Sequence, residues 1–160
     1  MSAAKILVVY YSRTGTTRRI AQALAAALHC DIEEITESKS RKGLFGYLRS
    51  AMEARRMLAA TIAPARHDVA AYELVIVGTP VWYWSLSSPV RAFLTATTAR
   101  LPKVAFFCTL GGSGSEKAFA QMAQIAGKQP QAVCAITQRD VQAGNYRDQL
   151  VTFVKALGSS

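Results

Sequence analysis

The sequence contains few residues that could hold a metal ion. Its two histidines are isolated, and its three cysteines, Cys30, Cys108 and Cys134, are far apart and form no Cys-x-x-Cys pair. Metal sites usually appear in a sequence as closely spaced ligands of these types. We therefore expect no metal site, and we expect the three cysteines to be reduced residues that pack in the interior.

Long apolar runs are also missing. No run approaches the roughly 20 residues that a membrane-spanning helix needs. The N-terminal residues Met1-Ser2-Ala3-Ala4-Lys5 lead directly into a strand-like segment without the pattern of a signal peptide. We therefore expect a cytoplasmic protein with no membrane span.

Acidic residues are scarce relative to basic ones. The chain has 10 acidic and 19 basic residues and a formal net charge of +9. Much of the excess lies in the segment 39–66, where Glu53 is the one acidic residue. This segment is suited to an acidic protein or an anionic membrane surface, or it is a solvated basic face. Because charge is the one feature that favours nucleic acid, we expect no nucleic-acid partner.

The remaining sequence alternates between strand-like and helix-like apolar patterns. This alternation predicts one α/β domain over residues 1–160, a three-layer sandwich with a five-stranded parallel sheet in the order 2-1-3-4-5 and helices on both faces. Pro89 is suited to the first turn of one helix and Ser115 to the N-cap of another. The expected strands are 5–11, 30–35, 73–78, 103–109 and 132–137. The expected helices are 16–28, 43–60, 89–97, 115–126 and 146–157, with a helical turn at 68–72.

A hydroxyl-rich loop follows the first expected strand. The free N–H groups and the dipole of the helix that comes next would attract an anion there. Gly15 would allow a close backbone approach or a positive φ. The sequence therefore predicts a phosphate site. Its candidate residues are Ser12, Arg13, Thr14, Gly15, Thr16 and Thr17.

Two further loops follow the third and fourth strands, and in this strand order all three loops converge at one edge of the sheet. The first of the two, 79–88, carries three consecutive aromatic residues, which would cover a flat ring system, act as a lid or form a dimer contact. The second is rich in glycine, and it would offer its backbone to the polar edge of a heterocycle or serve as a flexible connection. The candidate residues are Thr79, Pro80, Val81, Trp82, Tyr83 and Trp84, and Thr109, Leu110, Gly111, Gly112, Ser113 and Gly114.

Two other phosphate chemistries lack their essential residues. The hydroxyl-rich loop has no cysteine that could serve as the nucleophile of a phosphatase. It also lacks the Gly-Lys-Ser/Thr sequence that closes the phosphate loop of a nucleoside triphosphatase.

Together the three loops resemble those of flavodoxin-like proteins that bind FMN. Residues 12–17 match the family's phosphate loop of the form T/S-x-T-G-x-T, while 78–83 and 109–114 match its two ring loops. The resemblance implies that residues 12–17 hold the FMN phosphate. It further implies that Trp82, Tyr83 or Trp84 stacks on the flavin ring, and that Pro80, Val81 and the glycines of 111–114 meet its polar edge. Neither ring loop contains Asp or Glu.

The same resemblance implies a redox function. We expect an electron-transfer flavoprotein of the short-chain flavodoxin type, atypically basic, that works with an unidentified and acidic redox partner. The alternative is an NAD(P)H-dependent oxidoreductase that reduces quinones or similar small acceptors through the same pocket. A third interpretation is a non-redox binding domain, against which the aromatic loop argues. A homodimer is compatible with each of these.

Overall fold

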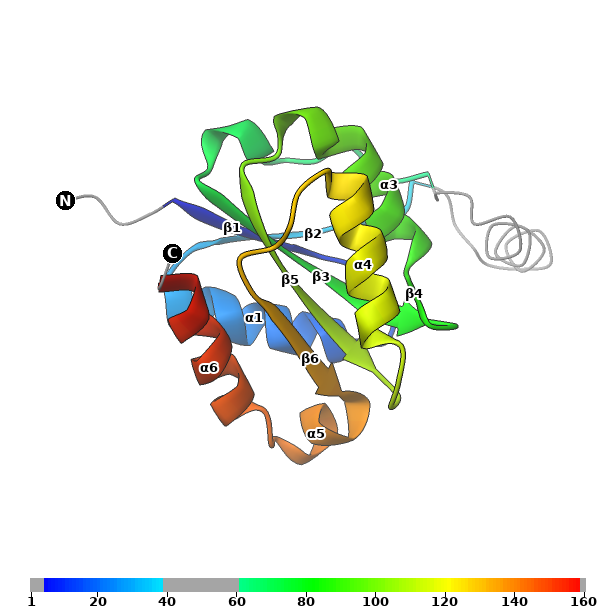
Figure 1. Ribbon diagram of the computed structural model, residues 1–160, viewed down its shortest axis with the longest axis vertical. Helices are drawn as coiled ribbons and strands as arrows, with labels where there is room; N and C mark the ends of the chain where they lie inside the picture. Colours follow the sequence, from blue (N-terminus) through cyan, green and yellow to red (C-terminus); the bar gives the residue numbers. More distant parts are fainter. Residues whose placement is uncertain (1–4, 39–60, 159–160) are drawn as a thin grey trace.

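The computed structural model describes residues 5–38 and 61–158. The helix expected over 43–60, and most of the basic segment with it, lies outside these residues. The described strands form a parallel sheet in the order β2-β1-β3-β5-β6, and a short strand, β4, pairs antiparallel with β3 (Figure 1). Their bounds are β1 Ile6–Tyr10, β2 Asp31–Glu34, β3 Leu74–Trp82, β4 Ser85–Leu86, β5 Lys103–Leu110 and β6 Val133–Thr137.

The five parallel strands have the predicted order, because β4 is an addition at the end of β3 rather than a strand of the main sheet. Helices cover both faces, as predicted, with α1 and α6 on one side and α3 and α4 on the other (Figure 1). The helices are α1 Thr16–Leu28, α3 Ser88–Thr97, α4 Ser115–Ala126, α5 Gln138–Ala143 and α6 Arg147–Gly158, with 3-10 turns at Val69–Ala71 and Thr98–Arg100.

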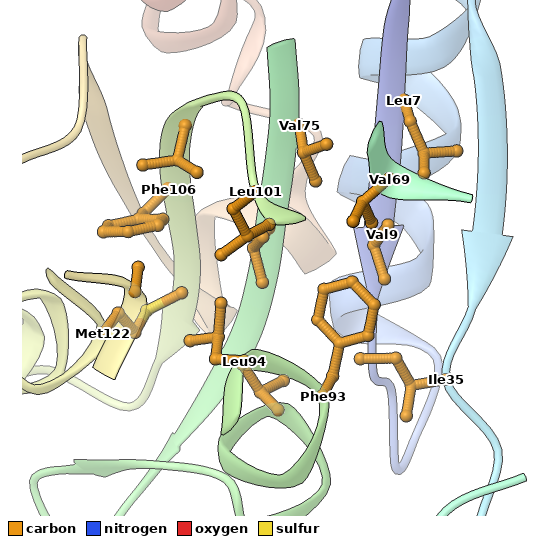
Figure 2. Packing of buried hydrophobic residues seen from close by; sticks show 14 of the residues in the cluster. Leu7, Val9, Ile35, Val69, Val75, Phe93, Leu94, Leu101, Phe106 and Met122 are labelled. Carbon is orange, nitrogen blue, oxygen red and sulfur yellow. The ribbon is translucent and has the colours of Figure 1, made fainter. Parts of the chain in front are cut away.

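Strand residues alternate between the two hydrophobic cores, since successive side chains of a strand point to opposite faces. In β1, Leu7 and Val9 face the core on the side of α3 and α4, a cluster that also includes Phe93, Leu94 and Met122 (Figure 2). The residues between them, with their equivalents in β3 and β5, pack against α1, α5 and α6. With both faces covered, the central strands β1, β3 and β5 are predominantly apolar, and the carboxyl edge of the sheet is where polar loops gather.

Two local predictions were wrong, and one helix was missed. The segment 79–88 is not a simple loop, because β3 continues to Trp82 and returns as β4. Ser115 is the first helical residue rather than the N-cap, a position that Gly114 takes with a φ of 104°. The helix α5 was not expected, and it begins where the Thr137 hydroxyl accepts a hydrogen bond from the amide of Asp140.

Pro89 lies in the first turn of α3, as predicted. Among the described residues, no helix is long and apolar enough to cross a membrane. Within that same part of the chain, no cluster of His, Cys, Asp and Glu is suited to a metal ion.

Candidate functional site

The hydroxyl-rich loop forms a tight turn between β1 and α1. The Ser12 hydroxyl accepts hydrogen bonds from the amides of Gly15 (3.0 Å) and Arg18 (3.1 Å). Gly15 precedes the helix with a φ of 97°, a conformation that favours glycine. In residues 5–38 and 61–158, no backbone carbonyl accepts from the amides of Thr16 and Thr17. These amides at the positive end of α1 are the kind of donor that binds an anion.

Two buried threonines join the first loop to the third. The Oγ1 atoms of Thr17 and Thr109 lie 2.7 Å apart, and both side chains are almost fully buried. Because each hydroxyl is the partner of the other, removing one leaves a buried polar atom without a hydrogen bond. The pair fixes the start of α1 to the end of β5.

Replacing Thr17 by valine is therefore expected to lower the free energy of unfolding by about 1–3 kcal/mol, since valine keeps the shape and strands the Thr109 hydroxyl. Urea denaturation monitored by circular dichroism measures this change. The double variant Thr17→Val/Thr109→Val should recover part of the loss, because neither hydroxyl is then unpaired. Additive losses would show that the two hydroxyls do not interact.

The aromatic segment is the tip of a β-hairpin. Trp82 pairs with Ser85 across a two-residue turn, and both turn residues have positive φ, 50° at Tyr83 and 61° at Trp84. This is the geometry of a type I′ turn, which usually contains Asn and Gly. The two side chains are 85% and 59% exposed. Bulky residues in this conformation are uncommon and tend to mark functional sites.

Neighbouring elements brace the hairpin. Gln121 of α4 accepts from the Leu86 amide at 3.1 Å and donates to the Ser85 hydroxyl at 3.2 Å. Thr79, predicted as a binding residue, is fully buried, and its hydroxyl accepts from the amide of Ser87 at 3.0 Å. Thr79 and Gln121 thus hold the returning strand of the hairpin in place through hydrogen bonds to residues 85–87. Gln121 was missed because it lies far away in the sequence.

The glycine-rich loop lies against the hairpin. The Trp84 indole Nε1 donates to the Ser113 hydroxyl at 3.0 Å, which connects the second and third loops. A Cβ on Gly114 would lie 2.8 Å from Trp84 Cα and 3.1 Å from Val81 Cγ1. Gly111 and Gly112 are exposed, and nothing lies within 4 Å of where their Cβ atoms would be. The three loops therefore converge, as the strand order predicted.

Two of the three arginines near the first loop have partners within the fold. Arg18 pairs with Glu34 of β2, and this carboxylate raises the pKa of the guanidinium. Arg19 donates to the carbonyl of Val141 at 3.4 Å. Arg13 is exposed at the turn itself. The loop therefore offers an anion mainly backbone amides rather than a cluster of cations.

The sequence did not point to two residues that the structure places beside the hairpin. Tyr11, directly after β1, lies edge-on to Trp82 with ring centroids 5.7 Å apart. Its hydroxyl donates to Glu37 at 2.7 Å. Neither ring loop has an acidic residue. The Glu37 carboxylate instead comes from the segment that follows β2. The contact between Glu37 and Tyr11 depends on the tertiary fold, so no local sequence pattern reveals it.

The three cysteines behave as packing residues, as expected. Cys108 and Cys134 are buried, Cys30 is half-buried, and none forms a disulfide. Burial raises the pKa of Cys108 to about 12 and that of Cys134 to about 11. Both thiols therefore stay protonated and unreactive near neutral pH.

The parallel sheet, its switch in strand order and the loops at that point define a doubly wound α/β protein, and the carboxyl edge is where ligands bind in such folds. The sequence model of the flavodoxin family matches residues 5–155, nearly the whole chain, and the protein belongs to this family. No match was found among curated protein sequences.

Solved structures agree with this assignment of the fold. A flavoprotein in complex with FMN from Lactobacillus acidophilus NCFM is 22% identical, with a TM-score of 0.73 over 88% of this chain and 98% of its own. A flavodoxin from Streptococcus pneumonia TIGR4 is 17% identical, with a TM-score of 0.61 over 98% and 99% of the two chains. A flavodoxin from the domain Archaea is 20% identical, with a TM-score of 0.53 over 95% and 98%.

Proposed function

We propose that the protein binds FMN at the three loops and transfers electrons to and from a protein partner. The single observation that carries this proposal is the junction of a helix-terminal anion loop with an exposed aromatic hairpin. These two parts are joined by the Thr17–Thr109 and Trp84–Ser113 hydrogen bonds. Family membership and the FMN complex of the Lactobacillus flavoprotein support the choice of cofactor.

The residues present fit each part of FMN. The amides of Thr16 and Thr17 and the hydroxyls of Thr14 and Thr16 would hold its phosphate, while the Ser12 hydroxyl shapes the loop and that of Thr17 is paired with Thr109. The exposed rings of Tyr83 and Trp84 would lose solvent-accessible apolar surface when a flat ring covers them. The open backbone at Gly111 and Gly112 would meet the polar edge of that ring.

Bound flavin supplies the redox chemistry, since it accepts and donates one or two electrons. The protein's residues hold the phosphate at the start of α1 and orient the ring against the hairpin. The hairpin and the glycine loop also keep water from the ring faces that they cover. An electron carrier needs one edge of the ring near the surface, and the exposed hairpin tip provides that placement.

The phosphate loop predicts a strong preference for FMN over riboflavin. Two hydrogen bonds to a charged phosphate, at about 1.5 kcal/mol each, correspond to about 100-fold tighter binding of FMN. Titration of the apoprotein with each flavin, followed by quenching of flavin fluorescence, measures the ratio. Equal affinities would contradict the assignment of the loop.

A variant and a control sharpen this test. Ser12→Ala removes the hydroxyl that shapes the loop, so it should weaken FMN binding and leave riboflavin binding nearly unchanged. Thr152→Ala serves as a matched control, because this exposed hydroxyl on α6 donates to the Asp148 carbonyl of its own helix. It should change neither affinity.

The electron-transfer function has its own test. We expect the flavin of the purified protein to be reduced slowly by NADH or NADPH alone and rapidly when a flavodoxin reductase is added. Absorbance of the oxidised flavin measures both rates. Rapid reduction by the nicotinamide alone would instead identify the protein as an NAD(P)H-dependent oxidoreductase.

A further inference from the structure

Tyr11 is fixed at the carboxyl end of the sheet. Its amide donates to the Gly78 carbonyl at 3.2 Å, which extends the pairing of β1 with β3 by one residue. Its ring meets that of Trp82 at an interplanar angle of 89° with centroids 5.7 Å apart. An edge-on pair of this kind contributes to stability beyond the surface that it buries.

The Tyr11 hydroxyl is held in turn by Glu37. The Oη atom donates to Glu37 Oε1 at 2.7 Å, and a carboxylate acceptor makes such a hydrogen bond stronger than a neutral one. Glu37 forms an isolated antiparallel bridge with Ile62. Two backbone hydrogen bonds flank the bridge, from Ser38 N to Thr61 O (3.2 Å) and from Ala63 N to Thr36 O (2.8 Å).

The three aromatic residues of the hairpin therefore differ in how they are held. Tyr83 and Trp84 lie at the strained tip and are mostly exposed. Trp82 is half-buried in regular strand geometry, and its ring is the one in contact with Tyr11. A ring that is already fixed loses less conformational entropy when a ligand binds to it.

We infer that Glu37 and Tyr11 are positioning residues that fix the Trp82 indole in its binding orientation. Glu37 orients the Tyr11 ring through its hydroxyl, and the Tyr11 ring orients Trp82. This role rests on the proposed function, because Trp82 belongs to the hairpin against which the flavin ring would be oriented. The orientation of the indole is nevertheless a property of the protein without flavin.

The first experiment therefore uses apoprotein. The chain has two tryptophans, so Trp84→Phe leaves Trp82 as the single indole. In this background we expect Tyr11→Leu to abolish most of the near-ultraviolet circular dichroism of Trp82, with smaller losses for Tyr11→Phe and Glu37→Gln. If Glu37 acts through the hydroxyl, Glu37→Gln has no further effect once Tyr11→Phe is present.

The second experiment measures flavin affinity with Trp84 retained. Loss of an edge-on aromatic pair is expected to weaken FMN binding by about 2- to 10-fold in Tyr11→Leu. Glu37→Gln should weaken FMN binding less than Tyr11→Leu does. It should have no further effect on FMN binding when Tyr11→Phe is already present. Riboflavin should show the same fold-changes, because Trp82 belongs to the ring side of the pocket.

Tyr72 provides a matched control. Its hydroxyl donates to Asp31 at 2.7 Å, the same tyrosine–carboxylate chemistry at the opposite end of the sheet. Tyr72→Phe and Asp31→Asn should leave both the Trp82 signal and the flavin affinities unchanged, although the first removes and the second weakens a hydrogen bond of the same kind. An effect as large as that of the Tyr11 variants would show a general structural role and overturn the inference.

The outcomes separate the two proposals. If the wild-type protein binds no flavin, the proposed function fails, and the Trp82 signal of the apoprotein still decides the positioning role. If flavin binds but Tyr11→Phe and Glu37→Gln leave the Trp82 signal unchanged, the positioning role alone is wrong. Additive effects of these two substitutions on Trp82 would also overturn it.

Discussion

Replacing Gly78 by alanine is expected to destabilise the protein by about 3 kcal/mol, the upper end of what overpacking a core usually costs. A Cβ at this position would lie 2.0 Å from Phe107 Cζ and within 2.5 Å of both Cε atoms. Phe107 is the cross-strand neighbour of Gly78 and is fully buried. Because the whole ring would have to move inside a packed core, relaxation is costly.

Urea denaturation of Gly78→Ala measures this loss, and Gly111→Ala is the matched control. Nothing lies within 4 Å of a Cβ on Gly111, so alanine there should change the stability by about 0.5 kcal/mol or less. Replacing the ring by a smaller side chain in Gly78→Ala/Phe107→Leu should recover part of the stability that Gly78→Ala loses. If the double variant loses more free energy of unfolding than the two single variants together, the proposed clash is contradicted.

Gly114→Ala is expected to cost about 2–3 kcal/mol, because it combines backbone strain with a contact that cannot relax. Gly114 has a φ of 104°, and its added Cβ would lie 2.8 Å from the backbone Cα of Trp84. The hairpin tip would have to move away from the third loop, and the Trp84–Ser113 hydrogen bond would be lost with it. We expect weaker FMN binding as well as lower stability.

Gly144→Ala separates strain from contact. Gly144 ends α5 with a φ of 77°, and nothing lies within 4 Å of its added Cβ. Alanine there should cost about 1 kcal/mol through backbone conformation alone and leave flavin affinity unchanged. Equal losses at Gly114 and Gly144, in both stability and affinity, would contradict a specific contact with Trp84.

The layers of the fold and the convergence of the loops could be predicted because they depend on local patterns. Continuous apolar strands alternate with helical periodicity, and this pattern leaves few topologies. The hairpin tip could not be predicted in the same way, since Tyr83 and Trp84 replace the Asn and Gly that usually mark a type I′ turn. Tertiary contacts there override the local preference.

The other features that could not be predicted from the sequence depend on contacts between distant segments. The Glu37 carboxylate reaches Tyr11 across 26 residues, and Gln121 reaches the hairpin from α4. A residue that lies next to a site in the sequence can also be bound to a partner elsewhere in the fold. Arg18 and Arg19 follow the phosphate loop in the sequence, yet one pairs with Glu34 and the other with a backbone carbonyl.

The engagement of these two arginines has a consequence for selectivity among anions. A surface that attracts by net charge binds polyanions of many shapes, and its binding weakens steeply as salt rises. A turn lined by amides instead discriminates by size and direction, since each N–H donates to an oxygen that lies along one line. The Ser12–Thr17 turn would therefore admit a terminal phosphate group and reject the continuous backbone of a nucleic acid, even in a chain of net charge +9.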